Sequence, residues 1–354
     1  MKKKVLLFVQ DGVGGAERMS VLIGKNLNPK IYDVCFCLVE RKSHSGIADF
    51  IPQGMPIKRL SNNNPLLLLW KMFRLICKEK PDVVFSSVFN LSNKLLLLKW
   101  ILPQSRFIIR CDNYLFTYSE KQQRILRRTY PKADILIAQT EEMGDELIEQ
   151  VGIPAAKVKV LHNPIDKSLI DKKLIGKSNP YLENERKHFV AVGRFNMQKG
   201  FDFLIDAFIK VVNCNKNVDL HVVGDNTIGG GEVAKAVRKT AELAGVGDLV
   251  HFYGYQDNPY PYIKNADCFV LSSRWEGLPN VLIEALYLGT PVAAFKCIPI
   301  IERIVDEGVT GYLAEKDNAT SLSEAMLKAV NLGRVESTYS GSSIDNFTSL
   351  FEKQ

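Results

Sequence analysis

Short apolar runs alternate with amphipathic stretches along the whole 354-residue chain. Apolar runs of this length indicate strands buried on both faces, and amphipathic stretches such as Pro65–Lys78 indicate helices. The predicted strands are Val5–Val9, Tyr32–Val39, Asp82–Ser86, Phe107–Arg110, Asp134–Ala138, Val158–Leu161, Phe189–Val192, Asp219–Val223, Val250–Phe252, Cys268–Leu271 and Val292–Phe295. Strands that alternate with helices predict parallel, doubly wound sheets of the α/β class.

The apolar pattern is interrupted at Asp166–His188, which is polar and rich in lysine and is interpreted as an interdomain linker region. A chain of this length is too long for one ordinary core. We therefore expect two Rossmann-like domains, residues 1–166 and 167–335, that face a central cleft. The remaining residues, 336–354, include the amphipathic stretch Ile344–Phe351, which we expect to pack back toward the N-terminal domain.

Composition indicates a globular protein, with 46% hydrophobic residues and a mean hydropathy of −0.04. No apolar run reaches the roughly 18 residues of a membrane span. Met1–Lys4 resembles the start of a signal peptide, but Gln10 and Asp11 end the apolar run that follows, which favours a buried strand. The seven scattered cysteines form no CxxC pair, so we expect reduced structural thiols in a cytoplasmic protein.

The charge is unevenly distributed. Residues 1–165 hold 25 Lys/Arg against 15 Asp/Glu, a net charge of +10, whereas residues 166–354 hold 21 against 24, a net charge of −3. This asymmetry suggests that only the first half meets an anionic surface or substrate. A nucleic-acid partner is not expected, because the basic half has no patch with interleaved aromatic residues.

The first predicted strand leads into a glycine-rich turn, Asp11–Arg18, and then into a helix. The turn does not match GxGxxG, but Gly14 and Gly15 let a ligand approach the backbone at a helix start. Ligands of doubly wound sheets bind at the carboxyl ends of the strands, a position that Asp112 and Thr140 also occupy. From the sequence, Arg110 could lie either in the cleft or on the surface.

The most informative stretch is Leu271–Phe295, predicted as strand, loop, helix and strand. A helix that starts near Pro279 or Asn280 directs its backbone N–H groups and positive dipole end at the preceding loop, which creates an anion site. Glu276 lies at the mouth of this site and Glu284 about one turn into the helix. Such carboxylates are suited to accept hydrogen bonds from sugar hydroxyls.

A second motif follows the first strand of the C-terminal domain. In the loop GRFNMQKG, Arg194 and Lys199 lie five positions apart, where a diphosphate would meet the carboxyl edge of the sheet. An arginine can donate two parallel hydrogen bonds and a lysine supplies a mobile charge, so together they offset two phosphate charges.

These motifs, with the VVGD strand end, the FYGY turn and EGLPNVLIEALYLGTPV, resemble the donor half of retaining family 4 glycosyltransferases (glycosyl transferases group 1) of the GT-B fold. Gly14-Gly15-Ala16-Glu17 is similar to that family's N-terminal glycine loop. The resemblance covers most of the chain. It implies a nucleotide-diphosphate sugar donor, most simply a UDP-sugar, no cofactor, no catalytic metal, and transfer with the anomeric configuration retained.

The resemblance also implies roles for individual residues. Arg194 and Lys199 would bind the diphosphate and stabilise the leaving group, Glu284 would hold the ribose hydroxyls, and Glu276 would contact the donor sugar. The remaining donor contacts would come from backbone or small residues: Gly14, Gly15, Gly193, Gly224, Tyr255, Leu278, Pro279 and Asn280. Neither glutamate is expected to act as a nucleophile, because retention in this family is usually explained by same-face attack.

One position departs from the family pattern. Many relatives place a histidine after the fourth strand of the N-terminal domain, where this chain has Asp112 in the stretch IIRCDN. Asp112 could contact the sugar's 6-hydroxyl or support positive charge at the anomeric carbon. Alternatively, it could only cap a turn or a helix.

The acceptor is suggested by two stretches, 65–80 and 91–106, that mix Leu and Trp with Lys and Arg. Such basic amphipathic helices can lie on an anionic membrane, or they can pack on the sheet with lysines at their ends. We expect a lipid-diphosphate-linked glycan acceptor, as in O-antigen or other cell-surface glycan assembly, and a peripheral location on the cytoplasmic face of the inner membrane. The alternatives are a UDP-sugar epimerase of the same fold and a non-enzymatic partner subunit.

Overall fold

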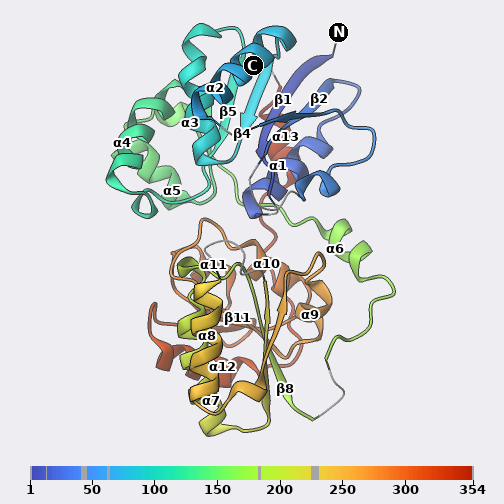
Figure 1. Cartoon of the computed structure of the whole chain (residues 1–354), viewed down its shortest axis with the longest axis vertical. Coiled ribbons are helices and arrows are strands. Elements are labelled where there is room, and N and C mark those ends of the chain that lie inside the picture. The colour runs from blue at the N-terminus through green and yellow to red at the C-terminus, as the bar shows by residue number, and fades with distance from the viewer. Residues whose placement is uncertain are drawn as a thin grey trace. The chain divides into compact units, whose positions relative to one another are not determined.

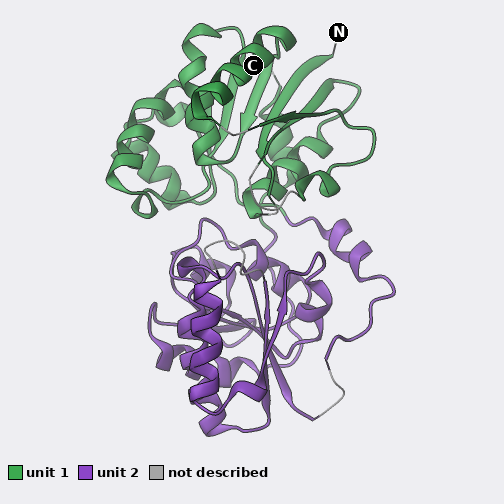
Figure 2. Ribbon diagram, viewed as in Figure 1, with its two compact units in different colours: residues 1–164, 341–354 green, residues 165–340 purple. Residues whose placement is uncertain are grey.

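The computed structural model describes residues 2–12, 14–40, 46–61, 64–181, 185–224 and 231–352. Asp225 of the VVGD strand end lies outside these residues, as does Gly230, near which the sequence pattern also predicts a helix start. The chain divides into two compact units (Figure 2). Unit 1 comprises Met1–Pro164 and Gly341–Gln354, and unit 2 comprises Ile165–Ser340.

The described residues of unit 1 form a parallel sheet with the strand order β3-β2-β1-β4-β5-β6-β7. Figure 1 labels β1, β2, β4 and β5 of this sheet. The strands are β1 (Lys3–Gln10), β2 (Tyr32–Val39), β3 (Ile57–Leu60), β4 (Val83–Ser86), β5 (Arg106–Arg110), β6 (Ile135–Ala138) and β7 (Val158–Val160). From β1 the chain continues to β2 and β3 on one side of β1, and then crosses back to β4, which pairs with the other side of β1. The order therefore reverses between these two neighbours, which is the switch point where such sheets bind ligands.

Helices connect the strands of unit 1. They are α1 (Gly15–Asn26), α2 (Pro65–Glu79), α3 (Phe89–Leu98), α4 (Glu120–Thr129) and α5 (Glu141–Asp145), with α13 (Ile344–Ser349) added from the end of the chain. Local sequence fixes several of their starts. The side chain of Asn64 caps α2 ahead of Pro65, and Ser119 forms a capping box with Gln122 at the start of α4.

Unit 2 repeats the same winding, with the order β10-β9-β8-β11-β12-β13 and parallel pairing throughout its described residues. The strands are β8 (Lys187–Val192), β9 (Val218–Val223), β10 (Val250–Gly254), β11 (Cys268–Leu271), β12 (Val292–Phe295) and β13 (Gly311–Ala314). Its helices are α6 (Lys167–Leu174), α7 (Phe201–Cys214), α8 (Glu232–Leu243), α9 (Tyr260–Asn265), α10 (Asn280–Tyr287), α11 (Ile301–Ile304) and α12 (Ala319–Ala329). The switch point of this sheet lies between β8 and β11.

The predicted fold, two Rossmann-like parallel-sheet domains of the α/β class, is confirmed, but two strands were missed. Ile57–Leu60 forms β3 at the edge of its sheet, where its side chains are exposed or only partly buried. Gly311–Ala314 forms the other missed strand, β13, also at an edge. Neither segment is a fully buried apolar run, which is why the pattern did not reveal it. The predicted linker region is also wrong in part, because it contains the helix α6.

The two cores consist of side chains from the sheets and the helices that cover them. In unit 1, Phe347 and Phe351 from the C-terminal segment are buried with the side chains of β1 and β2. All seven cysteines of the chain fall within the described residues and are free thiols. Within the described ranges, no helix is both long and apolar enough to cross a bilayer.

Candidate active site

The topology of unit 2 brings two loops together at its switch point. One follows β8 and contains Gly193, Arg194 and Lys199, whereas the other follows β11 and runs from Ser272 to Pro279. The loops are about 70 residues apart in sequence, but β8 and β11 are hydrogen-bonded neighbours. Their carboxyl ends therefore place the basic loop beside the acidic one.

Lys199 and Glu276 form an ion pair at this point. Lys199 Nζ lies 2.6 Å from Glu276 Oε1, and Ser273 Oγ donates to the same carboxylate oxygen at 2.6 Å. Both charged side chains are largely buried, with exposed fractions of 16% for Lys199 and 8% for Glu276. Charge-assisted hydrogen bonds in such surroundings are strong and hold a carboxylate in one orientation.

Further hydrogen bonds join the two loops. Ser272 Oγ donates to the Lys199 carbonyl at 2.9 Å, and Gln198 Nε2 donates to the Trp275 carbonyl at 3.1 Å. The backbone N–H of Arg274 donates to the Gln198 carbonyl at 2.8 Å. The ion pair is therefore held by a rigid frame rather than by two independent loops.

Three glycines leave the space that this frame needs. A Cβ atom on Gly224 would lie 1.7 Å from the Gly193 carbonyl oxygen, and one on Gly193 would lie 3.2 Å from the aliphatic part of Lys199. Gly200 has a φ of +60°, and a Cβ there would lie 2.1 Å from the Ser272 carbonyl oxygen. Glycine is therefore required sterically at 224 and 200, and it gives Lys199 room at 193.

The helix α10 begins at Asn280, at the predicted place. Pro279 is its N-cap residue and supplies no capping side chain, and Leu278 and Pro279 are buried at the helix entrance. Glu284, four residues into the helix, is half-buried, and its Oε1 accepts a hydrogen bond from the Tyr260 hydroxyl at 3.3 Å. Glu276 thus pairs with a lysine, and Glu284 accepts a hydrogen bond from a tyrosine on α9.

Two other predicted donor residues lie on the surface of unit 2. Arg194 follows β8 and is exposed, whereas Tyr255 follows β10 with 44% of its surface exposed. The structure does not bring Arg194 into the frame around Lys199. Its guanidinium is accessible to a ligand at the carboxyl edge of the sheet.

In unit 1, the predicted glycines lie at the start of α1. Gly14 is the N-cap residue, in an extended conformation, and Gly15 is the first residue of the helix. A Cβ on Gly14 would lie 2.4 Å from Glu17 Oε2, so the absence of a side chain lets Glu17 fold back over the turn. The loop after β4 contacts the same turn, because Ser87 Oγ donates to the Ala16 carbonyl at 2.8 Å.

Asp112 follows β5 and is held within unit 1. Its Oδ1 accepts a 2.6 Å hydrogen bond from the Tyr118 hydroxyl, and its Oδ2 lies 3.5 Å from the backbone N–H of Phe89, the first residue of α3. Burial raises the pKa of the Asp112 carboxyl, and the hydrogen bond from Tyr118 opposes that rise. These contacts match the helix-capping alternative, and contact with a sugar remains a prediction.

Arg110 is not on the surface, so that alternative is wrong. Its side chain is 2% exposed, and Nη2 donates to Gln139 Oε1 at 2.6 Å and to Asn163 Oδ1. Burial lowers the pKa of Arg110 to about 10. Gln139 and Asn163 follow β6 and β7, the next two strands of the sheet, and this places their amide oxygens beside the buried guanidinium.

Sequence reasoning missed Ser273 and Tyr260, which hold Glu276 and Glu284 respectively. Ser273 has a recognisable position, three residues before Glu276 in the loop that follows a buried strand. Tyr260 gave no comparable signal, because it reaches Glu284 from a different helix, α9.

Comparisons with known proteins assign this chain to a family. Residues 13–169 match the model described as Glycosyltransferase Family 4, and residues 177–339 match Glycosyl transferases group 1. The two matches together cover most of the chain. The protein belongs to the group 1/family 4 glycosyltransferases.

Relatives extend over different shares of the chain. A glycosyltransferase of Methanocaldococcus jannaschii is 29% identical over 67% of this chain, and the chain spans 62% of that relative's length. A Campylobacter jejuni enzyme, N-acetylgalactosamine-N,N'-diacetylbacillosaminyl-diphospho-undecaprenol 4-alpha-N-acetylgalactosaminyltransferase, is 22% identical over 96% of this chain and 93% of its own. The Anabaena protein HepE, solved in complex with UDP-glucose, shares the fold with a TM-score of 0.77 at 19% identity over 98% of both chains. This structural similarity confirms the predicted GT-B architecture.

Proposed function

We propose that this glycosyltransferase moves a hexose or N-acetylhexosamine from a UDP-sugar to a lipid-linked or growing glycan, with the anomeric configuration retained. The donor is supported by the UDP-glucose bound to HepE and by the basic residues at the carboxyl edge of unit 2. The acceptor class is supported by the name of the Campylobacter relative, which specifies a diphospho-undecaprenol. Two further relatives, from Erwinia amylovora and Staphylococcus aureus, carry names from amylovoran and capsular polysaccharide biosynthesis.

The observation that carries the donor assignment is the Lys199–Glu276 pair beside the entrance of α10. A UDP-sugar brings a diphosphate that needs cationic groups and hydroxyls that need acceptors. Lys199 and the exposed Arg194 would offset the charge that develops on the leaving diphosphate, and α10 would add its positive end. These groups could stabilise the leaving group without a catalytic metal, so we expect turnover without added Mg²⁺ or Mn²⁺.

The environment of Glu276 favours orientation of the sugar over covalent catalysis. Its Oε1 already accepts hydrogen bonds from Lys199 and Ser273, and these lower the nucleophilicity of the carboxylate. Attack by the acceptor on the same face as the departing UDP, with a phosphate oxygen taking its proton, needs no protein nucleophile. The chain then contributes position and electrostatics.

A membrane-facing surface is proposed on unit 1, in line with a lipid-linked acceptor. One side of α2 is buried through Leu68, Met72 and Ile76. Its other side, together with the end of α3 and the short helix Lys99–Ile101 that follows, exposes large apolar side chains. On α2 they are Leu66 (78% exposed), Leu67 (45%) and Trp70 (51%). On α3 and the short helix they are Leu97 (52%), Trp100 (85%) and Ile101 (62%).

We call these six exposed residues, which lie in the first two turns of α2 and at the end of α3 with the short helix after it, the apolar face of unit 1. The helices α2 and α3 pack against each other, and Arg74 stacks on Trp70 with its Cζ atom 4.8 Å from the ring centroid. Tryptophan and leucine beside basic residues favour an anionic bilayer surface. Co-sedimentation with anionic vesicles tests this proposal: Trp100→Ser should weaken binding, whereas Leu243→Ser, at a 79% exposed leucine in unit 2, should not. Equal binding by both variants would contradict the proposed face.

The proposed reaction is tested by incubating the protein with a panel of UDP-sugars and undecaprenyl-diphosphate-linked acceptors and identifying products by mass spectrometry. We expect one donor to give a glycan longer by one sugar, with the donor's anomeric configuration in its NMR spectrum. A UDP-sugar epimerised without acceptor would instead show an epimerase. Donor binding without turnover on any acceptor would indicate a non-enzymatic subunit.

A further inference from the structure

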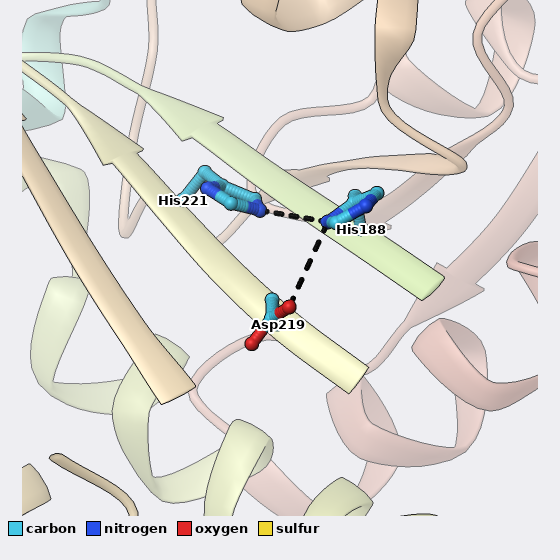
Figure 3. Close-up of side chains that lie close together, drawn as sticks. All are labelled: His188, Asp219 and His221. Carbon is cyan, nitrogen blue, oxygen red and sulfur yellow. Dashed lines mark hydrogen bonds and ion pairs between the residues drawn. The ribbon is translucent and has the colours of Figure 1, made fainter. Parts of the chain in front are cut away.

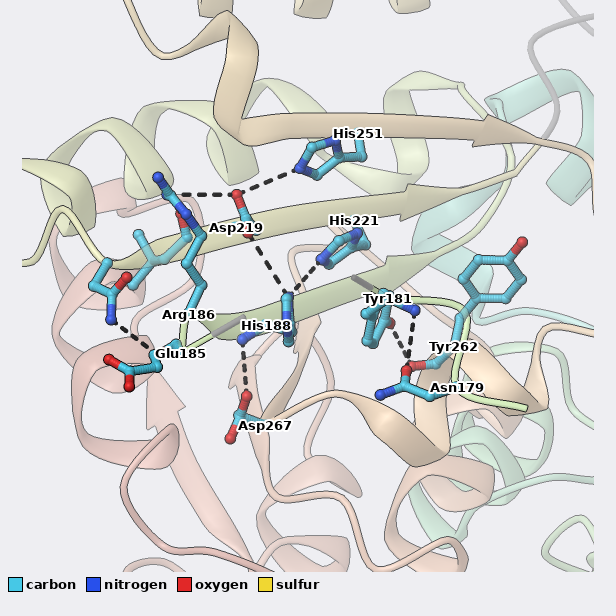
Figure 4. Close-up of polar contacts among 12 residues, drawn as sticks. Asn179, Tyr181, Glu185, Arg186, His188, Asp219, His221, His251, Tyr262 and Asp267 are labelled. Atoms are coloured by element: carbon cyan, nitrogen blue, oxygen red, sulfur yellow. Dashed lines mark hydrogen bonds and ion pairs between the residues drawn. The ribbon is translucent and has the colours of Figure 1, made fainter. Parts of the chain in front are cut away.

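Three of the chain's five histidines gather on one face of the unit 2 sheet, far from the donor residues in the strand direction. They are His188 on β8, His221 on β9 and His251 on β10, which are adjacent strands (Figure 4). His188 pairs in register with Asp219, and His221 pairs with His251. His188 and Asp219 are each the second residue of their strand, so the cluster lies toward the amino ends, whereas Gly193 and Gly224 follow the carboxyl ends.

We propose that His188, Asp219 and His221 bind a divalent transition metal ion, with zinc as the best match, at this end of the sheet (Figure 3). The three ligand atoms lie within 4.8 Å of one another and belong to buried residues. His188 Nδ1 is 2.9 Å from His221 Nε2 and 3.9 Å from Asp219 Oδ2. Ligand atoms around tetrahedral zinc lie about 3.4 Å apart, so shifts of about 0.5 Å would complete this part of the site.

The surroundings of His221 present the correct ring nitrogen to a metal. Its Nδ1 lies 3.1 Å from the Tyr253 hydroxyl. When Nδ1 carries the proton and donates it to this oxygen, Nε2 has a free lone pair directed at His188 and Asp219. Metal-binding histidines are usually oriented by such an outer hydrogen bond.

The buried carboxylate of Asp219 is paired with side chains only at long distances. Its carboxylate is buried at 5% exposure, yet its closest side-chain partners are His251 Nε2 at 3.4 Å, Arg186 Nη1 at 3.6 Å and His188 Nδ1 at 3.9 Å. None of these is a short charge-assisted hydrogen bond. A divalent ion between Asp219 and the two imidazoles would place positive charge at coordination distance from this carboxylate.

The cluster is closed on one side and accessible on the other. The ring of Tyr181 stacks on His188 at 4.7 Å and lies 4.0 Å from that of His221, and Asp267 accepts a hydrogen bond from the His188 backbone N–H. His251 is partly exposed, with 38% of its side chain accessible on the edge strand β10, and is the nearest candidate for a fourth ligand. An ion could enter from this edge. Once bound, it would connect β8 and β9, so we assign it a structural role distinct from the proposed transfer reaction.

The test uses untagged full-length protein stripped with EDTA and then titrated with Zn²⁺ by calorimetry, with Co²⁺ as a spectroscopic probe. We expect one zinc ion per chain, tetrahedral cobalt absorption bands, and a higher melting temperature with zinc. His188→Gln and His221→Gln should each weaken zinc binding roughly 100-fold or more, and Tyr253→Phe about 10-fold. His162→Gln, at a histidine beside Glu141 in unit 1, is the matched control and should bind zinc like the wild type.

The outcomes decide the proposal even when a variant misfolds. Wild-type protein that shows no tetrahedral cobalt bands would overturn it without reference to any variant. Wild-type affinity equal to that of folded His188→Gln or Asp219→Asn, as judged by circular dichroism in EDTA, would also overturn it and leave a hydrogen-bonded histidine network. Because none of these readouts involves glycosyl transfer, failure here would leave the proposed function untouched.

Discussion

Lys199 Nζ and Glu276 Oε1 lie 2.6 Å apart at the junction of two loops that follow neighbouring strands of unit 2. Ser273 donates to the same carboxylate oxygen, so the acid is fixed from two sides. This arrangement makes each charged residue dependent on the other. A substitution at either position therefore affects both the charge and the geometry of the proposed donor site.

Replacing Glu276 tests the orienting role. Glu276→Gln keeps the size of the side chain but removes the charge that holds Lys199, and Lys199 is then left with a weaker acceptor. We expect kcat/KM to fall roughly 10²–10³-fold, because a preorganised electrostatic contact is lost. Ser273→Ala, which leaves the ion pair intact, should cost about 10-fold or less. Steady-state kinetics with the identified donor measures both, and equal losses would contradict the ion pair's leading role.

Gly224→Ala tests the steric frame. The added methyl group would lie 1.7 Å from the Gly193 carbonyl oxygen, so the loop that positions Lys199 must move. We expect a loss of about 1–3 kcal/mol in the free energy of unfolding, together with reduced transfer. Gly247→Ala is the matched control, because its nearest neighbour, Glu242 Cγ, would lie at an ordinary 3.4 Å. Urea denaturation compares them, and similar midpoints for the two variants would refute the steric argument.

The two possible roles of Asp112, contact with the sugar and capping of α3, can be distinguished by replacing Tyr118. Tyr118→Phe removes the hydroxyl that opposes the burial-raised pKa of the Asp112 carboxyl, so that pKa should rise further. If ionised Asp112 serves the reaction, the acidic limb of the kcat/KM profile should shift to higher pH by about one unit. If Asp112 only anchors the start of α3, Tyr118→Phe should lower the melting temperature and leave the pH profile unchanged.

The acid stability of unit 1 should depend on Glu79. Lys4 Nζ donates to its Oε2 at 2.6 Å and Lys58 donates to its Oε1, and these bonds lower the pKa of Glu79 to about 2 from an ordinary value of 4.5. A depressed carboxyl pKa stabilises the fold above pH 4.5, and that stability is lost as the pH falls from 4.5 toward 2.

Glu79→Gln should therefore destabilise the protein by roughly 1–3 kcal/mol at pH 7, and the difference from the wild type should shrink below pH 4.5. Denaturant titrations at a series of pH values measure this difference. A difference that stays constant from pH 7 to pH 3 would show that the ion pairs contribute nothing.

The sequence predicted those parts of the fold that depend on continuous burial. Cys268–Leu271 and Val292–Phe295 were placed at their observed bounds, because strands covered on both faces are apolar throughout. The edge strand Ile57–Leu60 was not predicted, because its outward positions carry no periodic signal. The helix α6 was not predicted, because a short, lysine-rich helix resembles a linker in composition.

The candidate site was predictable as a set of residues but not as a set of contacts. The loop GRFNMQKG and the carboxylates Glu276 and Glu284 could be found by motif and spacing. The Lys199–Glu276 ion pair could not, because it depends on β8 lying next to β11, which is a property of strand order. The histidine cluster was missed for the same reason, since His188 and His221 meet only through the register of β8 and β9.

The central claim, that glycosyl transfer depends on the Lys199 site, is tested most directly by the turnover of Lys199→Ala with the identified UDP-sugar and acceptor. We predict a loss of at least about 10³-fold in kcat, because the leaving diphosphate loses a fixed cation. Lys187→Met, at a lysine paired with Asp267 at the opposite end of β8, should retain wild-type turnover. Near-normal kcat for folded Lys199→Ala would contradict the account.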